Sequence, residues 1–339
     1  MSPPHTQTRT NGTRNAPYIL GTRSVLFPIA AGNTAVLKFS ELSPRVGWGL
    51  CSVLQEAGLP AGVLNMIVHE PAAAAEITKS LIAHPAVKKI NFTGSTAVGR
   101  IIGRLAGEQL KPVLLELGGK APAIVWEDAD LDNAAKWCAI GAFFNSGQVC
   151  MSTERILVHK GVRAAFEEKL KATVDKIFGG DQDALVLINA PAADKNRKLM
   201  RDAVSKGASV VYGDVEAKES TATRMRPIVI SGVKEEMDIY QTESFGPTVS
   251  LFEIETEEEA LRIANDTEYG LTSAVFTEDL RRGLRFAKGI ETGAVHINSM
   301  TIHDESALPH GGAKSSGHGR FNAQALHEWV RTKTVTFKY

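Results

Sequence analysis

Two side chains in this sequence have the chemistry of a nucleophile and of a base. Cys150 follows a helix-patterned segment that ends in a glycine-containing turn, and residues 155–159 beyond it are strand-patterned. A thiol held between two rigid elements keeps a fixed position, which a nucleophile needs. The structural alternative is a small core residue, because cysteine is among the most buried residue types.

Glu116 is the candidate base. It ends the apolar stretch 112–117 and is followed by two glycines. Such strands are usually buried on both faces, and burial raises the pKa of a carboxyl group toward the range that suits a general base. The glycines allow close approach of chain or ligand. An ion pair with Lys120 would explain the same pattern structurally.

Two strand ends predict a nucleotide site. Gly94 and Ser95 close one strand where a helix opens, so unpaired backbone N–H groups there could bind a phosphate, with Ser95 capping the helix or binding the anion. Lys38 and Glu41 follow another strand and could bind ribose hydroxyls. A carboxylate at this place repels a 2′-phosphate and so favours NAD, with NADP as the alternative. Exposed charged loops and ordinary turns explain these residues equally simply.

A third segment carries a carboxylate and a flat ring. Glu243 lies two residues before Phe245 at a Gly-Pro turn, where the pair could hold a ribose and brace a ring. His296, His303 and His310 are spaced by seven residues, but metal-binding histidines cluster at shorter spacing, so we predict no metal site.

The elements that position these residues alternate between strand and helix patterns, which indicates an α/β fold with a mostly parallel sheet covered on both sides. A nucleotide site at the carboxyl ends of the strands is then expected. The strand-patterned stretches are residues 34–38, 63–68, 87–92, 112–117, 155–159, 208–212, 227–230, 274–277 and 294–298. The helix-patterned stretches are residues 45–57, 73–84, 96–109, 131–142, 162–178, 192–206, 257–265 and 279–288, the third with Val98, Ile101, Ile102 and Leu105 on one face.

Composition narrows the class of protein. The 339 residues can build one large or two ordinary domains. The 38 basic and 38 acidic residues balance, so no surface for nucleic acid is indicated. No apolar run approaches the roughly 18 residues of a membrane span. The three cysteines cannot all pair, which favours a reducing compartment such as the cytoplasm.

Seven short motifs, in order along the chain, resemble the aldehyde dehydrogenases. The resemblance covers nearly everything from Asn15 to Tyr339, and residues 296–305 with the Asn-Ala-Pro start are most similar to members that act on aromatic aldehydes. The motifs are residues 15–17, 38–41, 92–96, 115–120, 145–150, 243–247 and 311–320.

The resemblance implies a complete mechanism. Cys150 would attack the aldehyde as a thiolate to give a thiohemiacetal, with the oxyanion held by the Asn15 amide and the Cys150 N–H. Hydride would pass to the nicotinamide, leaving a thioester that water activated by Glu116 would release as the acid. Lys38, Glu41, Ser95, Glu243 and Phe245 match cofactor contacts.

The resemblance also implies a domain plan. A partial Rossmann-like dinucleotide-binding domain would occupy residues 14–118, and an α/β catalytic domain residues 119–311. Residues 312–329 would return to the cofactor domain, and 330–339 would form an oligomerisation strand, since residues 332–337 are rich in β-branched types without a local partner. The polar residues 1–13 are expected to be disordered.

The chain also departs from the family pattern. It lacks the N-terminal helices, early strands and first part of the oligomerisation arm, has Arg14 and Phe39 where Trp and Pro are usual, and shortens the 179–189 connection. Missing neighbours expose sheet edges and apolar surface. The alternative function is therefore an inactive family-like protein that only binds nucleotide or associates with relatives.

Overall fold

The computed structural model describes residues 7–11, 15–179 and 183–339 and divides into two compact units. The first unit contains residues up to Leu117 together with Asp304–Gly311 and Gly317–Tyr339. Its six-stranded sheet has the order β15-β5-β4-β1-β2-β3, parallel except for β15. These strands are β1 (Gln7–Asn11), β2 (Thr34–Lys38), β3 (Leu64–Ile67), β4 (Val87–Thr93), β5 (Val113–Glu116) and β15 (Gly317–His318).

Strand β1 differs from the disorder expected for residues 1–13, of which residues 1–6, 12 and 13 lie outside the described part of the chain. Gln7–Asn11 pairs in parallel with both β2 and β4, near the middle of the sheet. The sequence concealed this strand because Gln, Thr, Arg, Thr and Asn lack the apolar run typical of interior parallel strands. Backbone pairing with two neighbours forms the strand here despite that polar composition.

Helices cover both faces of this sheet. Ile90 and Phe92 of β4 pack in one cluster with residues of α3 and α4, whereas Leu37 packs in another with residues of α1 and α2. The predicted apolar face of α4 was half wrong, because Ile102 is buried and Ile101 is 52% exposed. The elements are α1 (Pro17–Ala30), α2 (Pro44–Glu56), η1 (Pro71–Ala73), α3 (Ala74–Ala83), α4 (Thr96–Glu108) and η5 (Ala323–Trp329).

The second unit contains Gly118–His303 and Gly312–Ser316. Its seven-stranded sheet has the order β14-β13-β6-β7-β12-β11-β9, parallel except for β9, and a two-stranded sheet pairs β8 with β10. The strands are β6 (Ala121–Val125), β7 (Thr153–His159), β8 (Leu185–Val186), β9 (Ser209–Tyr212), β10 (Arg224–Met225), β11 (Ile228–Ser231), β12 (Thr248–Ile254), β13 (Ser273–Phe276) and β14 (Val295–Ile297). The predicted α/β class with mostly parallel sheets is confirmed.

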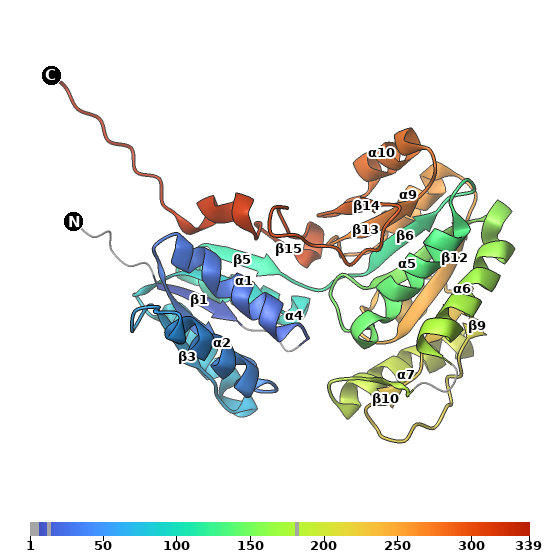
Figure 1. Cartoon of the computed structure of the whole chain (residues 1–339), viewed down its shortest axis with the longest axis horizontal. Helices are drawn as coiled ribbons and strands as arrows, with labels where there is room; N and C mark the ends of the chain where they lie inside the picture. Colours follow the sequence, from blue (N-terminus) through green and yellow to red (C-terminus); the bar gives the residue numbers. More distant parts are fainter. Residues whose placement is uncertain (1–6, 12–14, 180–182) are drawn as a thin grey trace. The chain divides into compact units, whose positions relative to one another are not determined.

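Alternating side chains of β6 supply two cores in the second unit. Ala123 and Val125 pack against α5 and α6, whereas Ile124 packs on the opposite face with residues of α7, α9 and α10. Figure 1 shows α5 and α6 lying side by side along this sheet. The helical elements are α5 (Leu131–Phe143), η2 (Phe144–Gly147), η3 (Lys160–Val162), α6 (Arg163–Phe178), α7 (Ala190–Ser205), α8 (Asp238–Gln241), α9 (Glu257–Asn265), α10 (Leu280–Gly289) and η4 (Lys314–Ser316).

The C-terminal segment has no strand partner within the described chain, and its role as an oligomerisation strand stays a prediction. Residues 330–339 form no strand, and all of them are exposed in the extended tail of Figure 1. A strand needs a hydrogen-bonded neighbour, and the described part of this chain supplies none there. Asp304–Gly311 belongs to the first unit, so the chain returns to that unit earlier than the expected residue 312. No described helix is long and apolar enough to cross a bilayer.

Helix α5 offers a test of the local physics that delivers Cys150. The Asp130 carboxylate accepts hydrogen bonds from the backbone N–H groups of Asp132 and Asn133, which caps the first turn. We expect Asp130→Ala to lower the free energy of unfolding by about 1 kcal/mol. Asp130→Asn is the matched control, because asparagine caps about as well, and equal urea midpoints for the two variants would contradict the capping role.

Candidate active site

Cys150 lies at the end of a loop with an unusual backbone. After α5, Asn145, Ser146 and Gly147 have φ values of 50°, 61° and 69°, three left-handed residues in succession. Only glycine adopts this conformation freely, and each other residue held there costs about 1–3 kcal/mol. The surrounding contacts must therefore hold the loop in place.

Two glycines make the close approaches around this loop. A Cβ on Gly147 would lie 2.1 Å from the carbonyl oxygen of Gly246, and a Cβ on Gly119 would lie 2.1 Å from the carbonyl oxygen of Cys150. Real Cβ atoms are not found that close to other atoms, so both positions require glycine. The glycines after Glu116 therefore serve close approach of chain to chain, as the sequence suggested.

Side chains brace the loop on both sides of the thiol. The Gln148 amide donates to the carbonyl oxygens of Asn145 and Val186, at 3.1 Å and 3.2 Å, and accepts from the N–H of Ile188 at 2.8 Å. On the far side, the Thr301 hydroxyl donates to the carbonyl oxygen of Met151 at 2.6 Å. These bonds fix the backbone that carries Cys150, as a positioned nucleophile requires.

The three cysteines have different environments. None forms a disulfide, and Cys150 is half-buried. Cys138 is fully buried in α5, and burial strongly raises the pKa of its thiol. Burial also raises the pKa of Cys51. The thiolate is the nucleophilic form of cysteine, and the raised pKa of Cys138 disfavours that form. Cys138 therefore has the structural core role that the sequence had left open as the alternative interpretation of Cys150.

Lys120 has a partner other than the one proposed for it. Its ammonium group lies 2.5 Å from the Glu154 carboxylate and 2.8 Å from the carbonyl oxygen of Thr242. Glu154 also accepts from the N–H groups of Ser244 and Phe245. The structural alternative of a Glu116–Lys120 ion pair is therefore wrong, and Lys120 instead fixes the segment that carries Glu243.

Glu243 is the least compensated carboxylate of this network. One of its oxygens accepts from the N–H of Gly119 at 2.9 Å. Burial, followed by the nearby Glu154 carboxylate, raises the pKa of Glu243 to about 7. Phe245, two residues later, has a left-handed φ of 51°. The predicted cofactor contacts of Glu243 and Phe245 remain predictions.

Glu116 is buried, as its strand pattern predicted, and its partners come from distant segments. Its side chain is 1% exposed at the end of β5. Arg23 of α1 contacts Oε2, and Nε2 of His310 lies 3.2 Å from Oε1. The Arg23 guanidinium also lies over the Phe321 ring, 4.3 Å from its centroid. The carboxylate is thus fixed between a permanent cation and an imidazole.

Lys38 and Glu41 form a pair beyond the carboxyl end of β2. The Lys38 ammonium group lies 3.2 Å from Oε2 of Glu41. Burial alone would raise the pKa of Glu41, but a backbone hydrogen bond and Lys38 bring that pKa below its usual value. Glu41 therefore stays anionic at neutral pH, which is the charge expected of a carboxylate that repels a 2′-phosphate.

The turn between β4 and α4 is capped by its serine. The Ser95 hydroxyl accepts from the N–H of Val98 at 3.4 Å, which confirms Ser95 as the helix cap. The N–H of Gly94 donates to the carbonyl oxygen of Glu116 at 3.1 Å, so that donor is already paired. A Cβ on Gly94 would lie 2.5 Å from the Phe92 ring, which explains the glycine through packing. Phosphate binding at this turn remains a prediction.

The predicted site residues fall into two sets. Asn15, a half-buried residue just before α1, belongs to the first unit together with Lys38, Glu41, Gly94, Ser95 and Glu116. Cys150, Glu243 and Phe245 belong to the second unit. Within the second unit, Gly119 connects them, since its N–H binds Glu243 and its Cα faces the Cys150 carbonyl.

A comparison with protein-family models identifies the family of this chain. The model for the "Aldehyde dehydrogenase family" matches residues 13–335. The chain belongs to the aldehyde dehydrogenase family. That family comprises oxidoreductases, so the predicted enzyme class is confirmed.

Named relatives narrow the comparison within the aldehyde dehydrogenases. The chain is 46% identical over 330 residues to vanillin dehydrogenase of Pseudomonas fluorescens, covering 96% of this chain and 68% of the relative. It is 40% identical to benzaldehyde dehydrogenase YfmT of Bacillus subtilis, covering 96% and 67%. A solved salicylaldehyde dehydrogenase from Pseudomonas putida G7, complexed with salicylaldehyde, superposes with a TM-score of 0.92 at 37% identity, covering 99% and 71%. The chain thus spans about two thirds of the length of these aldehyde dehydrogenases.

Four side chains of these networks were not anticipated. Arg23, Asp304 and His310 surround Glu116, and Glu154 organises Lys120 and the 242–245 backbone. His310 was considered only as a metal ligand. Each lies far along the chain from the group that it contacts, so no local spacing identifies it. Charged residues within otherwise apolar patterns, such as Arg23 in α1 and Glu154 in β7, were the available signal.

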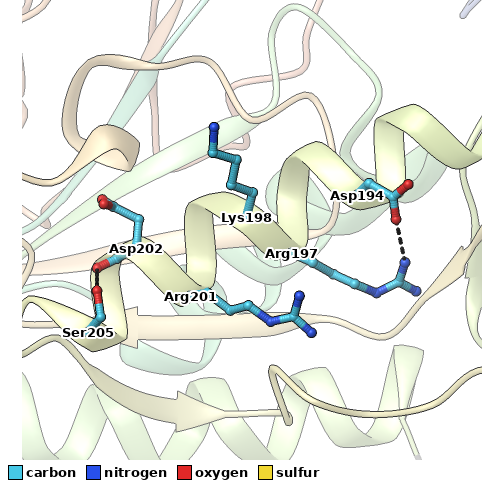
Figure 2. A pocket seen from close by; sticks show the side chains of 6 residues that line it. All are labelled: Asp194, Arg197, Lys198, Arg201, Asp202 and Ser205. Carbon is cyan, nitrogen blue, oxygen red and sulfur yellow. Dashed lines mark hydrogen bonds and ion pairs between the residues drawn. The ribbon is translucent and has the colours of Figure 1, made fainter.

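Other polar features of this aldehyde dehydrogenase lie apart from these networks in the sequence. A surface depression follows α7, and Figure 2 shows Arg197 and Arg201 projecting from the same side of that helix. Asp194 pairs with Arg197, and Glu216 with Arg201. Among the described residues, no group of three or more His, Cys, Asp or Glu side chains is placed to hold a metal ion.

The raised pKa of Glu243 predicts a pH dependence of stability. Between about pH 4.5 and 7 the folded protein holds a proton on Glu243 that the unfolded chain has released, so wild-type stability falls as pH rises through this window. Glu243→Gln has no carboxyl group to titrate, so its free energy of unfolding does not fall in this window. Each pH unit by which the wild-type pKa is raised corresponds to about 1.4 kcal/mol. Urea unfolding should show that the free energy of unfolding of Glu243→Gln rises relative to that of wild type as the pH increases from about 4.5 to 7. The control Glu258→Gln, at an exposed position in α9, should run parallel to wild type.

Proposed function

We propose that this aldehyde dehydrogenase oxidises a hydrophobic, aromatic aldehyde to its carboxylic acid with NAD. The observation that carries the proposal is the rigid loop of Cys150, in which three left-handed residues are held by glycine contacts and by Gln148. Such a loop suits a thiol that must meet a carbonyl carbon in one geometry. The named relatives act on vanillin, benzaldehyde and salicylaldehyde, which supports an aromatic substrate.

The chain's own residues have distinct roles in this proposal. Cys150 attacks the aldehyde carbon as a thiolate, and the Asn15 amide with the Cys150 N–H stabilises the resulting oxyanion. Glu116 takes a proton from the water that releases the acid from the thioester. The fixed position of the carboxylate supports this use, because Arg23 contacts one of its oxygens and His310 lies 3.2 Å from the other.

The donor set near β2 fits a dinucleotide. Lys38 and Glu41 offer a cation and an anion at the end of a parallel strand, suited to ribose hydroxyls, and the anionic state of Glu41 favours NAD over NADP. Bound NAD would supply the hydride acceptor. The paired N–H of Gly94 leaves the remaining backbone donors of α4 as the groups that would face a phosphate.

Exposed apolar side chains favour a second candidate, association with a relative without catalysis. Ile19 is 70% exposed, Trp48 is 64% exposed and Ile101 is 52% exposed, on α1, α2 and α4. Exposed apolar side chains of this size occur at protein interfaces. Formation of NADH from benzaldehyde and NAD by the purified chain would decide for the enzyme, and its absence for the associating protein.

Replacement of Cys150 tests the proposed nucleophile. We expect Cys150→Ala to abolish both NADH formation and hydrolysis of p-nitrophenyl acetate, because both reactions need an acyl group on sulfur. Thermal unfolding should be nearly unchanged, since the thiol is only half-buried. Cys51→Ala is the matched control and should keep both activities. If Cys150→Ala hydrolysed the ester at the wild-type rate, the Cys150 thiol would not be the nucleophile.

Replacement of Glu116 tests the base. Glu116→Gln keeps the shape but cannot accept a proton, so we expect one round of NADH formation followed by turnover slowed by about 10²–10⁴. Rapid-mixing absorbance at the NADH band separates the first round from the steady state. An unaltered steady state would show that another group activates the water.

A further inference from the structure

Glu116 and three other ionisable side chains, those of Arg23, His310 and Asp304, form a cluster within the first unit. Arg23 bridges two carboxylates, since its two terminal nitrogens contact Glu116 and lie 3.4 Å from Asp304. His310 lies between the same carboxylates, with Nε2 3.2 Å from Glu116 and Nδ1 3.9 Å from Asp304. These residues come from α1, β5 and the 304–311 segment, so the fold brings them together.

Exposure increases along this cluster. The side chain of Glu116 is 1% exposed, that of His310 is 6% exposed, and that of Asp304 is 21% exposed. Asp304 is held by Asn322, whose amide donates to Oδ1 at 2.8 Å. The order Glu116, His310, Asp304 therefore leads from a buried carboxylate to one that meets solvent.

The proposed hydrolysis places a proton on Glu116 once per turnover. Water adds to the thioester carbon, its proton passes to Glu116, and the C–S bond breaks to give the carboxylic acid and the Cys150 thiolate. Glu116 then carries the proton, and the sulfur is ready for the next aldehyde. A carboxyl group that is 1% exposed meets bulk solvent rarely, so a path of side chains would speed the return of this proton for the next cycle.

Of Arg23 and His310, the two side chains placed against the Glu116 carboxylate here, His310 is the one that can transmit a proton. Arg23 stays protonated at any ordinary pH and serves as a fixed charge. An imidazole can accept a proton at one nitrogen while it releases another from the opposite nitrogen. His310 presents Nε2 to Glu116 and Nδ1 toward Asp304.

We propose that His310 is a positioning residue that holds Glu116 and carries its proton to Asp304. His310 accepts the proton at Nε2, 3.2 Å from Glu116, and releases the Nδ1 proton to a water that bridges the 3.9 Å to the Asp304 carboxylate, which passes the proton to solvent. The charge on each group is restored when the imidazole returns to its first tautomer. This role rests on the proposed function, because it requires Glu116 to act as the base.

The charges facing His310 agree with a neutral resting imidazole. Burial, followed by Arg23 and Arg320, lowers the pKa of His310 to about 4, although Asp304 acts in the opposite direction. Glu116 faces the ring from β5. At neutral pH the ring is therefore uncharged, and a charged imidazolium does not persist beside Arg23.

Ester hydrolysis tests this role without any cofactor. Stopped-flow mixing of the full chain with p-nitrophenyl acetate measures acylation of Cys150 as a nitrophenolate burst and release of acetate as the steady state. We expect His310→Gln to keep the burst and the thermal unfolding midpoint while the steady state falls at least about tenfold. His318→Gln replaces an exposed histidine of the same unit and should match wild type.

A second variant separates proton transfer from simple support. His310→Ala should lose the same step and regain several-fold rate when imidazole is added, because the cavity left by the side chain accepts the free ring. Support alone predicts no such rescue. Loss without rescue, or an unchanged steady state in His310→Gln, would overturn the proposal. Absence of a burst from wild type would instead remove the thiol chemistry on which both proposals rest.

Discussion

The backbone of residues 145–150 is the constraint on which the proposed chemistry depends. Asn145 and Ser146 occupy a left-handed conformation that is costly for residues with a side chain, and Gly147 continues it. The loop persists because the Gly246 and Cys150 carbonyls approach Gly147 and Gly119 more closely than a Cβ would allow, and because Gln148 satisfies three backbone groups. The position of the thiol is therefore a property of the whole loop.

Three carboxylates show how different the surroundings of one functional group are within this chain. Glu154 has Lys120 and two backbone N–H donors, so its negative charge is well compensated. Glu243 has one backbone donor and the Glu154 charge beside it, and its pKa rises to about 7. Glu116 has a cation on one oxygen and an imidazole near the other. The three carboxylates therefore differ in their partners, and for Glu243 the surroundings raise the pKa.

Local patterns were sufficient for the regular elements and insufficient for their partners. Helix α9 and strand β2 have the predicted bounds, because apolar periodicity and caps are encoded locally. Strand β1 was missed because a polar stretch is held by two neighbours. The strand predicted at residues 332–337 was expected to pair away from its local sequence, so the exposed tail of a single chain leaves it a prediction. Strand formation depends on pairing that composition alone does not specify.

Only part of the candidate site was predictable, because local patterns identify single residues but not their distant partners. Cys150 and Glu116 were found because each ends a local pattern, a helix with its turn and an apolar strand. The partner of Glu116 was wrong because Lys120, four residues away, was the nearest cation in the local sequence, whereas Arg23 lies 93 residues away. Side-chain partners across a parallel sheet are set by topology, and the intervening sequence does not reveal them.

Arg23 lies between two carboxylates that the fold brings together, Glu116 and Asp304. Glu116 and Asp304 lie on either side of His310, so two acidic side chains share one small region of the first unit. A guanidinium can contact both at once through separate nitrogens, and its stacking on Phe321 holds the fork in place. An ammonium group would act as a single point charge without that fork. The same bridge also keeps the two carboxylates on opposite sides of one imidazole, so the geometry of the proposed proton path follows from the contacts of Arg23.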